Sequence, residues 1–252
     1  MIPARLGSER LPRKPLQLIA GRPLVEWVWR CASSLRTLDV VVVATDSEEV
    51  AGCCRGFGAE VELTSAAHES GTERVAEVAA RSGYEAFDVV VNVQGDEPFV
   101  TEEQVAGCVS AVRAGFDIGT VATPLLALAS WRDPAVVKVV RNGEGSAMYF
   151  TRAPVPHARG RSPSAAELAS PLYLRHIGVY AYSRPALAQW VALPVSGLER
   201  LERLEQLRAL EAGLSIGVTV VSGAEGGIDT PEDLARAEER LSGSSGASGK
   251  NP

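Results

Sequence analysis

The run Val-Val-Val-Val-Ala at residues 40–44, followed at once by Thr45-Asp46-Ser47, decides the fold class of this chain. A continuous β-branched run is typical of a strand that is buried on both faces of a sheet. The polar residues after it are good helix caps, and residues 48–57 then predict a helix that ends near Gly58. The stretch therefore predicts a strand–loop–helix unit.

The same alternation continues along the first half of the chain. Further strands are predicted at 60–63, 88–93 and 118–123, and helices at 72–81 and 102–114. Buried strands joined by helical crossovers predict an open, mostly parallel sheet flanked by helices, which is an α/β fold.

The pattern changes between residues 136 and 182. The segments there are short and β-like, at 136–140, 147–151 and 173–182. We interpret 136–182 as a smaller mixed or antiparallel insertion, because a stretch with Pro, Ser and Gly at 154–171 joins its parts.

The last part of the chain returns to helical spacing. Leucines at positions 198, 201, 204 and 207 predict one helix over 198–212, with Gly213 as its C-cap. A strand at 216–221 and a helix at 231–241 follow. Residues 242–252 are rich in Gly and Ser and are expected to be disordered, so we expect one domain over residues 1–241.

The composition is that of an ordinary soluble globular protein, with 46% hydrophobic and 22% charged residues in a chain of 252. A net charge of −6 argues against a general nucleic-acid binder, because such proteins carry a basic face toward the phosphates. No apolar run approaches the roughly 20 residues that span a bilayer, and the first residues lack a signal-peptide pattern. We therefore expect a cytoplasmic protein with no nucleic-acid or membrane partner.

The cysteines Cys31, Cys53, Cys54 and Cys108 show no C-x-x-C spacing, and no histidine is near them in the sequence. This favours reduced, mostly buried thiols over a zinc site or a disulfide. The sequence assigns no role to Cys53 and Cys54.

Positive charge is concentrated near the N-terminus. Between residues 3 and 16, four cations stand against the single acid Glu9: Arg5, Arg10, Arg13 and Lys14. Arginine forks grip phosphate oxygens in pairs and a lysine acts as a point charge, so the segment suits a polyphosphate. A solvated surface loop has the same features, and the charges alone leave both interpretations open.

Two carboxylates are placed where a metal could bind. Asp96 follows the strand predicted at 88–93, and ligands of open α/β sheets sit outside the carboxyl ends of strands. Asp229 precedes a helix for which Thr230 can serve as N-cap, with Pro231 in the first turn and Asp233 reaching back. An ordinary turn at Asp96 and a plain polar residue at Asp229 are the alternatives.

Three weaker signals remain. Residues 71–74 open a helix and suit either a nucleotide or a capping role for Thr72. His176 lies in an apolar strand, which favours a hydrogen-bonded core residue over a ligand contact. Glu205 and Gln206 lie in the leucine-rich helix, where a solvated face is the more frequent role.

In this order, the motifs resemble those of the 3-deoxy-manno-octulosonate cytidylyltransferases, or CMP-KDO synthetases. The resemblance runs from residue 2 to about 240 and is carried by Ile2-Pro3-Ala4-Arg5, Arg10-Leu11-Pro12, Lys14-Pro15-Leu16, Ala44-Thr45-Asp46, Ser70-Gly71-Thr72-Glu73-Arg74, residues 92–98, Val137-Lys138-Val139-Val140, Tyr149-Phe150, Arg152-Ala153, Arg175-His176-Ile177-Gly178, residues 204–208 and residues 229–234. It implies a nucleotidyltransferase-like α/β fold, a homodimer, and CTP with Mg²⁺.

The resemblance also implies residue roles. Arg10 and Lys14 would hold the triphosphate, and Asp96 and Asp229 the magnesium. The nucleotide pocket would be lined by Ala4, Arg5, Thr72 and Gln94. The acceptor would be faced by Arg152, His176, Tyr180, Glu205 and Gln206, with 136–182 forming the acceptor site or the dimer contact. An acceptor oxygen would attack the α-phosphorus of CTP and displace pyrophosphate.

The sequence departs from the family pattern at three points. Arg13 stands where the family usually has Gly, and His157 where it often has Trp. The chain also begins at the end of the first expected strand, so we expect a shortened strand or an earlier start. These departures bear on the geometry of the first loop and on the sugar pocket.

Three alternatives stay open. Relatives that resemble this family cytidylylate a small phosphonate such as phosphonoformate, so the acceptor is octulosonate or such a phosphonate. A CTP-binding module without turnover would keep the fold. A glycosyltransferase of similar architecture is disfavoured, because no D-x-D motif occurs near a strand end.

Overall fold

The computed structural model describes residues 1–7, 11–223 and 225–245. The chain divides into two compact units. Unit 1 comprises Met1–Arg81, Asn92–Thr101 and Glu225–Pro252, and unit 2 comprises Ser82–Val91 and Glu102–Ala224. Each unit is described by itself.

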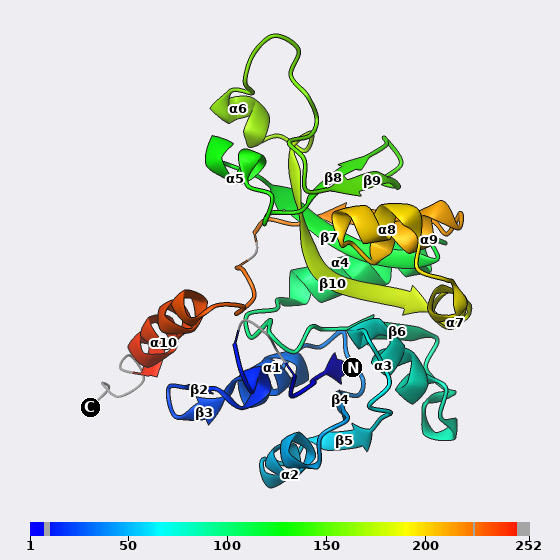
Figure 1. The fold of residues 1–252 in the computed structure, drawn as a ribbon, viewed down its shortest axis with the longest axis vertical. Helices are drawn as coiled ribbons and strands as arrows, with labels where there is room; N and C mark the ends of the chain where they lie inside the picture. The colour runs from blue at the N-terminus through cyan, green and yellow to red at the C-terminus, as the bar shows by residue number, and fades with distance from the viewer. Residues whose placement is uncertain (8–10, 224, 246–252) are drawn as a thin grey trace. The chain divides into compact units, whose positions relative to one another are not determined.

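Unit 1 is built on a parallel three-stranded sheet in the order β1-β4-β5 (Figure 1). Its strands are β1 (Ile2–Pro3), β4 (Val42–Thr45) and β5 (Glu60–Leu63), with Ile2 opposite Val43 and Val42 opposite Glu60. All four residues of β4 are buried, which confirms the strand predicted from the apolar run.

Unit 1 also contains helices. They are α1 (Leu24–Ser33), α2 (Glu48–Gly56), α3 (Gly71–Ala79) and α10 (Pro231–Ser245). The 3-10 helix η1 (Lys14–Leu16) leads into a hairpin of β2 (Leu18–Ile19) and β3 (Arg22–Pro23). Ser47 caps α2 by accepting a hydrogen bond from the Val50 amide, as the polar residues after the strand predicted.

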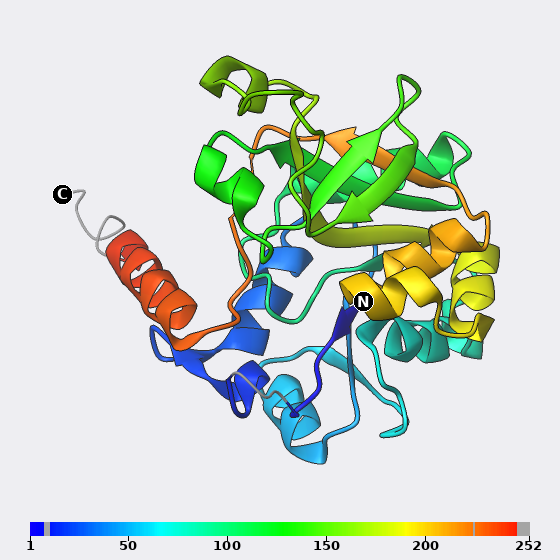
Figure 2. The same ribbon diagram turned by 45° about the horizontal axis from the view of Figure 1, so that its top comes forward.

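Unit 2 holds a mixed sheet in the order β11-β7-β10-β8-β9, with β6 also paired to β10 (Figure 2). The strands are β6 (Val89–Asn92), β7 (Ile118–Pro124), β8 (Lys138–Arg141), β9 (Ala147–Thr151), β10 (Leu174–Ser183) and β11 (Ile216–Val220). β11 runs parallel to β7, whereas β10 runs antiparallel to both β7 and β8. The α/β class and the mixed insertion are therefore confirmed.

The helices of unit 2 are α4 (Glu102–Arg113), α5 (Leu128–Arg132), α6 (Ala165–Leu168), α7 (Arg184–Ala192), α8 (Gly197–Glu202) and α9 (Gln206–Glu211), with a 3-10 turn η2 (Ser82–Tyr84). α4 packs on β7, β10 and β11. A separate small core of Leu125, Trp131, Leu168 and Tyr173 holds the segments around α5 and α6 together.

The helix predicted over 198–212 is wrong as one element, because α8 ends at Glu202 and α9 begins at Gln206. Arg203 between them has a left-handed backbone, with φ of 53°, which stops the helix. Leu201 is 80% exposed while Leu204 is 6% exposed, so the leucine spacing does not define one buried stripe. A buried ion pair between Arg208 and Glu199, at 2.6 Å, ties the two short helices together.

The last helix is longer than the sequence indicated. α10 runs to Ser245, past the expected end at Leu241, and the rest of the expected tail lies outside the described residues. The four cysteines are unpaired with one another, as predicted. Across the described residues, no helix has both the length and the apolar character that a membrane span requires.

Candidate active site

Lys14 joins two carboxylates that are distant in the sequence. Its Nζ donates to Asp96 Oδ2 at 2.5 Å and to Asp229 Oδ1 at 2.7 Å. The lysine side chain is 14% exposed, against 28% for Asp96 and 43% for Asp229. All three residues belong to unit 1, so folding of this unit alone brings the two candidate metal carboxylates to one cation.

Asp96 is positioned by a tight turn after β6. The Glu97 amide donates to the Gln94 carbonyl at 3.1 Å, and a Cβ added at Gly95 would lie 2.5 Å from the Pro3 carbonyl oxygen. Only glycine allows this approach of the turn to β1. The Ile228 amide also donates to the Asp96 carbonyl at 2.9 Å, which brings the segment before α10 to the same turn.

Asp229 is positioned by the start of α10. The amides of Asp229 and Thr230 donate to Asp233 Oδ2 at 3.0 and 2.9 Å, and the Asp233 amide donates back to Thr230 Oγ1 at 3.2 Å. This is the predicted capping arrangement, with Asp233 as the reaching acid. Burial alone would raise the pKa of Asp233, but the hydrogen bonds from Asp229 and Thr230 lower it. Because Thr230 and Asp233 cap the helix, the Asp229 carboxylate takes no part in capping and accepts a hydrogen bond from Lys14.

The carboxylate pair is suited to Mg²⁺ in the presence of phosphates. Among the residues that the structure describes, no cluster of three or more His, Cys, Asp or Glu side chains could hold a metal ion. Mg²⁺, however, is usually bound by one or two carboxylates together with substrate phosphates and water. Asp96 and Asp229 therefore fit an ion whose coordination a triphosphate completes.

The residues expected to line the nucleotide pocket lie in unit 1 as well. Ala4 is buried, and its amide donates to the Ala44 carbonyl at 2.8 Å. Arg5 Nη1 donates to the Glu69 carbonyl at 3.3 Å, just before α3. A Cβ added at Gly71 would lie 3.1 Å from Pro3 Cγ and 3.8 Å from Gln94 Oε1. The end of β1, the start of α3 and the turn at Gln94 thus converge.

Ser70, and not Thr72, caps α3. The Ser70 hydroxyl accepts from the Glu73 amide at 3.2 Å, and the Glu73 carboxylate accepts from the Ser70 amide at 3.4 Å. The capping role weighed for Thr72 is therefore wrong, since Ser70 already satisfies this helix end. Thr72 is buried in the first turn of α3.

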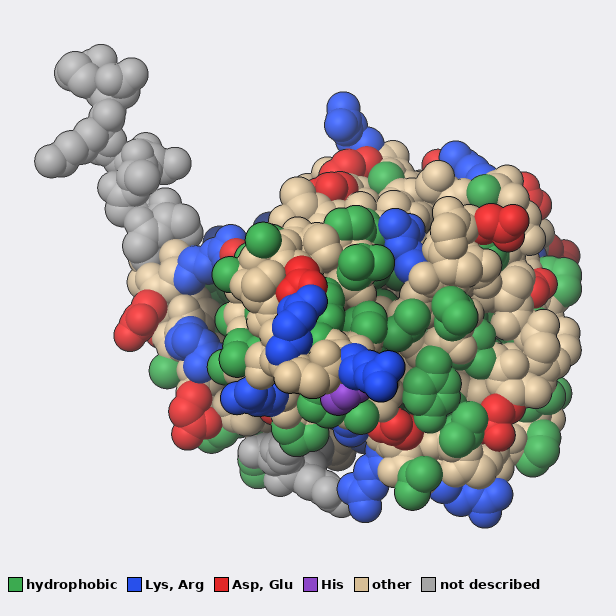
Figure 3. Space-filling model, turned by 90° about the horizontal axis from the view of Figure 1, so that it is seen from above, with side chains coloured by type: hydrophobic (Ala, Val, Ile, Leu, Met, Phe, Trp, Pro, Cys, Tyr) green, Lys and Arg blue, Asp and Glu red, His purple; other side chains and the backbone are tan. Residues whose placement is uncertain are grey.

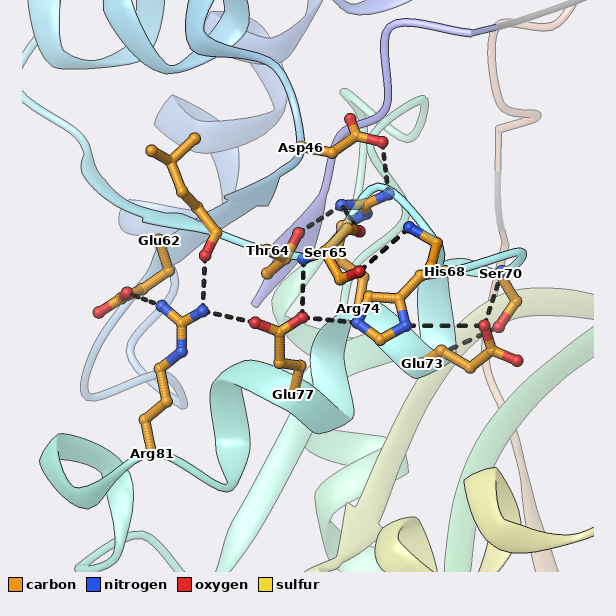
Figure 4. A network of polar contacts seen from close by, with 12 residues as sticks. Asp46, Glu62, Thr64, Ser65, His68, Ser70, Glu73, Arg74, Glu77 and Arg81 are labelled. Carbon is orange, nitrogen blue, oxygen red and sulfur yellow. Dashed lines mark hydrogen bonds and ion pairs between the residues drawn. The ribbon is translucent and has the colours of Figure 1, made fainter.

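A polar network that the sequence did not reveal supports this end of α3 (Figure 4). Arg74 is 2% exposed and binds Asp46 Oδ2 at 2.9 Å, while its other nitrogen bonds the Thr64 hydroxyl. It links the carboxyl ends of β4 and β5 to α3. Arg74 and Asp46 each stand in a motif of the sequence, Ser70 to Arg74 and Ala44 to Asp46, but their contact joins segments that are distant along the chain.

His68, Glu77 and Arg81 extend the network. Glu77 Oε2 lies 2.6 Å from His68 Nε2, and Glu77 Oε1 lies 2.6 Å from Arg81 Nη2. Burial alone would raise the pKa of Glu77, but hydrogen bonds from the Ser65 amide, His68 and Arg81 lower it to about 2. The segment between β5 and α3 is therefore held by ionic contacts.

Arg13, another residue of the basic segment, is not part of the Lys14 cluster. Arg10 lies outside the described residues. Arg13 pairs with Glu49, and both side chains are half exposed. Its backbone is left-handed, with φ of 55° and ψ of 34°, a conformation that glycine adopts without strain. The departure at position 13 therefore places a strained arginine at a turn.

The residues expected at the acceptor belong to unit 2. The rings of His176 and Tyr180 on β10 have centroids 5.3 Å apart, and Phe150 lies 5.1 Å from His176. His176 Nε2 is 3.0 Å from Thr120 Oγ1, and burial lowers the pKa of His176 to about 3. His176 is therefore a neutral hydrogen-bonding group.

Three of the residues expected at the acceptor, Arg152, Glu205 and Gln206, lie around the α8–α9 junction. Gln206 is buried at the start of α9, which contradicts a solvated face for it, whereas Glu205 is exposed. Burial and, to a smaller degree, the charges of Tyr182 and Glu205 raise the pKa of Tyr180. Arg152 donates to the carbonyls of Glu202 at 2.8 Å and Pro134 at 3.0 Å. His157 is exposed in the loop before α6.

Comparison with known proteins shows the family of this chain. A family model described as Cytidylyltransferase matches residues 1–216. The chain is 52% identical over 238 residues to a 3-deoxy-manno-octulosonate cytidylyltransferase of Gemmatimonas aurantiaca, covering 94% of this chain and 91% of that protein. It is 45% identical to a protein of the same name from Syntrophotalea carbinolica, covering 96% of this chain and 98% of that protein.

Solved structures give the same result. A CMP:2-keto-3-deoxy-manno-octonic acid synthetase complexed with CTP superposes with a TM-score of 0.87 at 36% identity, over 96% of this chain and 97% of that one. A 4-diphosphocytidyl-2C-methyl-D-erythritol synthase from Anaerococcus prevotii has a TM-score of 0.60 at 15% identity, over 96% of this chain and 98% of that one, and shares the fold alone. The chain therefore belongs to the cytidylyltransferase family of nucleotidyltransferases, in the group of the 3-deoxy-manno-octulosonate cytidylyltransferases.

Proposed function

We propose that this enzyme transfers CMP from CTP to 3-deoxy-manno-octulosonate and releases pyrophosphate in a Mg²⁺-dependent reaction. The observation that carries the proposal is the contact of Lys14 with both Asp96 and Asp229. At such a point the ammonium can bind phosphate oxygens of a triphosphate, and the two carboxylates can bind its metal ion. The names of the relatives at 52% and 45% identity support octulosonate as the acceptor.

The transfer is an in-line displacement. A hydroxyl oxygen of the acceptor forms a bond to the α-phosphorus of CTP and loses its proton to water. The bond from that phosphorus to the bridging oxygen breaks, so pyrophosphate leaves with the electron pair. Bound Mg²⁺ supplies charge neutralisation on the phosphates. Lys14 donates to phosphate oxygens, and Arg10 adds a bidentate fork. Ala4, Arg5, Thr72 and Gln94 orient the nucleoside, which raises the effective concentration of the reacting groups.

Three of the five residues assigned to the acceptor, His176, Tyr180 and Gln206, are uncharged. His176 is neutral because of its lowered pKa, so it exchanges hydrogen bonds with acceptor oxygens and does not act as a cation. Tyr180 packs against it, and Gln206 offers amide donors and acceptors. Arg152 is the positive group of this set and suits a carboxylate.

We also propose that the enzyme is a cytoplasmic homodimer. Large hydrophobic side chains are exposed on unit 2, namely Leu126, Met148, Leu172 and Leu201. Figure 3 looks onto the side of α5 and α6, where hydrophobic side chains gather among Lys and Arg. Met148 lies on β9, an end strand of its sheet. Sedimentation equilibrium of the full chain tests the dimer, and a concentration-independent monomer would contradict it.

The reaction is tested by pyrophosphate release from CTP with Mg²⁺, using octulosonate and phosphonoformate side by side. We expect turnover with octulosonate and a product with the mass of its CMP conjugate. Turnover with the phosphonate alone would reassign the acceptor. Binding of CTP without pyrophosphate release with any acidic acceptor would instead identify a non-catalytic CTP-binding module, and binding of sugar nucleotides would favour a glycosyltransferase.

A further inference from the structure

We infer that Lys14 is an internal competitor for the metal. In the nucleotide-free protein its ammonium occupies the position between Asp96 and Asp229, and a divalent cation must displace it. This inference rests on the proposed function, because it concerns the same carboxylate pair. It adds an order of events, in which the metal enters, the lysine leaves the carboxylates, and the released ammonium then meets the phosphates.

Lys14 is the counter-ion of both carboxylates, Asp96 and Asp229. Two carboxylate oxygens that accept from one ammonium, at 2.5 and 2.7 Å, are close enough to share one cation. Without a positive partner, the two carboxylates would repel each other. Lys14 is also less exposed than either aspartate, so water screens this contact less than a surface ion pair.

An ammonium and a divalent cation cannot both occupy this position. A Mg²⁺ ion requires its oxygen ligands at about 2.0–2.1 Å in octahedral geometry. The same oxygens now hold the Lys14 ammonium, and two cations at such a distance repel strongly because little water lies between them. Binding of the metal therefore requires the lysine side chain to move.

The chain allows that movement without moving the backbone. Lys14 starts η1, where Pro15 is buried and the Gln17 amide donates to the Lys14 carbonyl at 3.2 Å. The four-carbon stem of lysine rotates about several bonds, while the backbone that carries it stays held by this turn. The displaced ammonium remains in the same site, next to the position of the metal-bound phosphates.

The wild-type protein offers a direct test, because the chain has three lysines, Lys14, Lys138 and Lys250. Lysine labelled with ¹³C at Cε gives one NMR signal for each. Lys138 is an internal control, since its Nζ donates to the carbonyls of Asp133, Val136 and Arg152 at 2.6–2.8 Å. We expect Mg²⁺, added without CTP, to shift the Lys14 signal and leave that of Lys138 unchanged. A Lys14 signal that stays fixed while Mg²⁺ saturates the site would overturn the inference.

Mn²⁺ affinity gives a second test. Lys14→Met removes the competitor, so Mn²⁺ should bind the nucleotide-free variant about tenfold more tightly or better, measured by the free-ion signal in electron paramagnetic resonance. Pyrophosphate release by the same variant should fall. The matched control is Arg55→Met, which removes an exposed cation paired with Glu48 and should leave Mn²⁺ affinity within about twofold. Equal or weaker Mn²⁺ binding by Lys14→Met would contradict the inference.

Failure of the inference and failure of the proposed function are distinguishable. If the wild-type enzyme releases pyrophosphate but its Lys14 signal does not change with Mg²⁺, the proposed function stands and the displacement of Lys14 by the metal is refuted. If Mg²⁺ shifts the Lys14 signal but no acidic acceptor gives turnover, the displacement of Lys14 stands and the proposed function is refuted. If Lys14→Met does not fold, the NMR experiment on the wild type still decides.

Discussion

Lys14, Asp96 and Asp229 of unit 1 are charged and partly exposed, whereas His176 and Tyr180 of unit 2 are uncharged and pack against aromatic rings. In unit 1, Lys14 faces Asp96 and Asp229 through charge-assisted hydrogen bonds. In unit 2, His176 has a pKa lowered to about 3 by burial and lies between Phe150 and Tyr180. The two clusters therefore offer a ligand different interactions, namely charge in unit 1 and neutral hydrogen bonds with aromatic packing in unit 2.

This contrast matches the chemistry of the two proposed ligands. A triphosphate carries several charges that grow or shift during transfer, so preorganised charged groups are effective there. An acceptor sugar is recognised by hydroxyl groups as well as its carboxylate, and buried neutral partners discriminate between such groups because an unpaired one is costly. Mutations in the two units should therefore differ in size and in the kinetic constant that they change.

The largest effect is expected from the carboxylates of unit 1. Asp96→Asn and Asp229→Asn each remove a negative charge from the proposed metal site, and kcat should fall by about 10²- to 10³-fold or to background. The fold should remain, because Lys14 keeps the other carboxylate as partner. Pyrophosphate release at saturating Mg²⁺ and circular dichroism measure the two outcomes, and a near-normal rate in either variant would remove that residue from the site.

The next effect concerns stability in unit 1. Arg74→Met breaks the buried pair with Asp46 and leaves that carboxylate without its cation, so the free energy of unfolding should fall by about 3–5 kcal/mol. Arg55→Met, at an exposed pair, should change it by less than about 1 kcal/mol. Urea denaturation measures both, and equal losses in the two variants would show that the Arg74 network does not hold the start of α3.

Sequence reasoning predicted the parts that depend on local patterns. The strand at β5, the strand at β9 and the capping of α10 by Thr230 and Asp233 follow from alternation and helix-start chemistry, and they appear as predicted. Individual element ends moved by one to a few residues, where fraying and capping decide. The contact of Lys14 with Asp96 and Asp229 could be suspected from strand-end placement, but not established.

What the sequence missed depends on contacts between distant segments. The break at Arg203 does not follow from leucine spacing. Glu202, the last residue of α8, accepts hydrogen bonds from the Thr151 hydroxyl and the Arg152 amide, which are distant along the chain. The Arg74 network joins three segments that no local window contains. The surroundings of His176 on β10 include Phe150 on β9 and Thr120 on β7, which are distant along the chain.

A smaller effect is expected from the pH dependence of unit 2. The folded pKa of His176 is about 3 and the unfolded value is near 6.5, so below pH 6.5 the unfolded state binds a proton that the folded state does not. Stability therefore falls as the pH drops below 6.5, by at most about 1.4 kcal/mol per pH unit from this group. His176→Gln should flatten that slope between pH 6.5 and 4.5.

The pH range of the stability loss distinguishes the effect of His176 from that of Glu77 in unit 1. Glu77 has its pKa lowered from 4.5 to about 2, so its contribution to stability is lost only as the pH falls below 4.5 toward 2. His157→Gln, at an exposed histidine, is the matched control and should leave the slope unchanged. Denaturation midpoints across the window decide, and an unchanged slope in His176→Gln would show that this histidine is not held neutral.

The smallest effect on stability is expected from two arginines, one in each unit, that share a left-handed backbone conformation. Arg13 in unit 1 and Arg203 in unit 2 have nearly the same left-handed backbone, with φ of 55° and 53°. Glycine relieves the strain of such a position, so each arginine-to-glycine change should stabilise the protein by about 0.5–1 kcal/mol. Arg13→Gly also loses its exposed contact with Glu49, so it should gain slightly less than Arg203→Gly. Thermal denaturation measures the two, and because both side chains are exposed, a loss of stability in either variant would mean that its contacts outweigh the backbone strain.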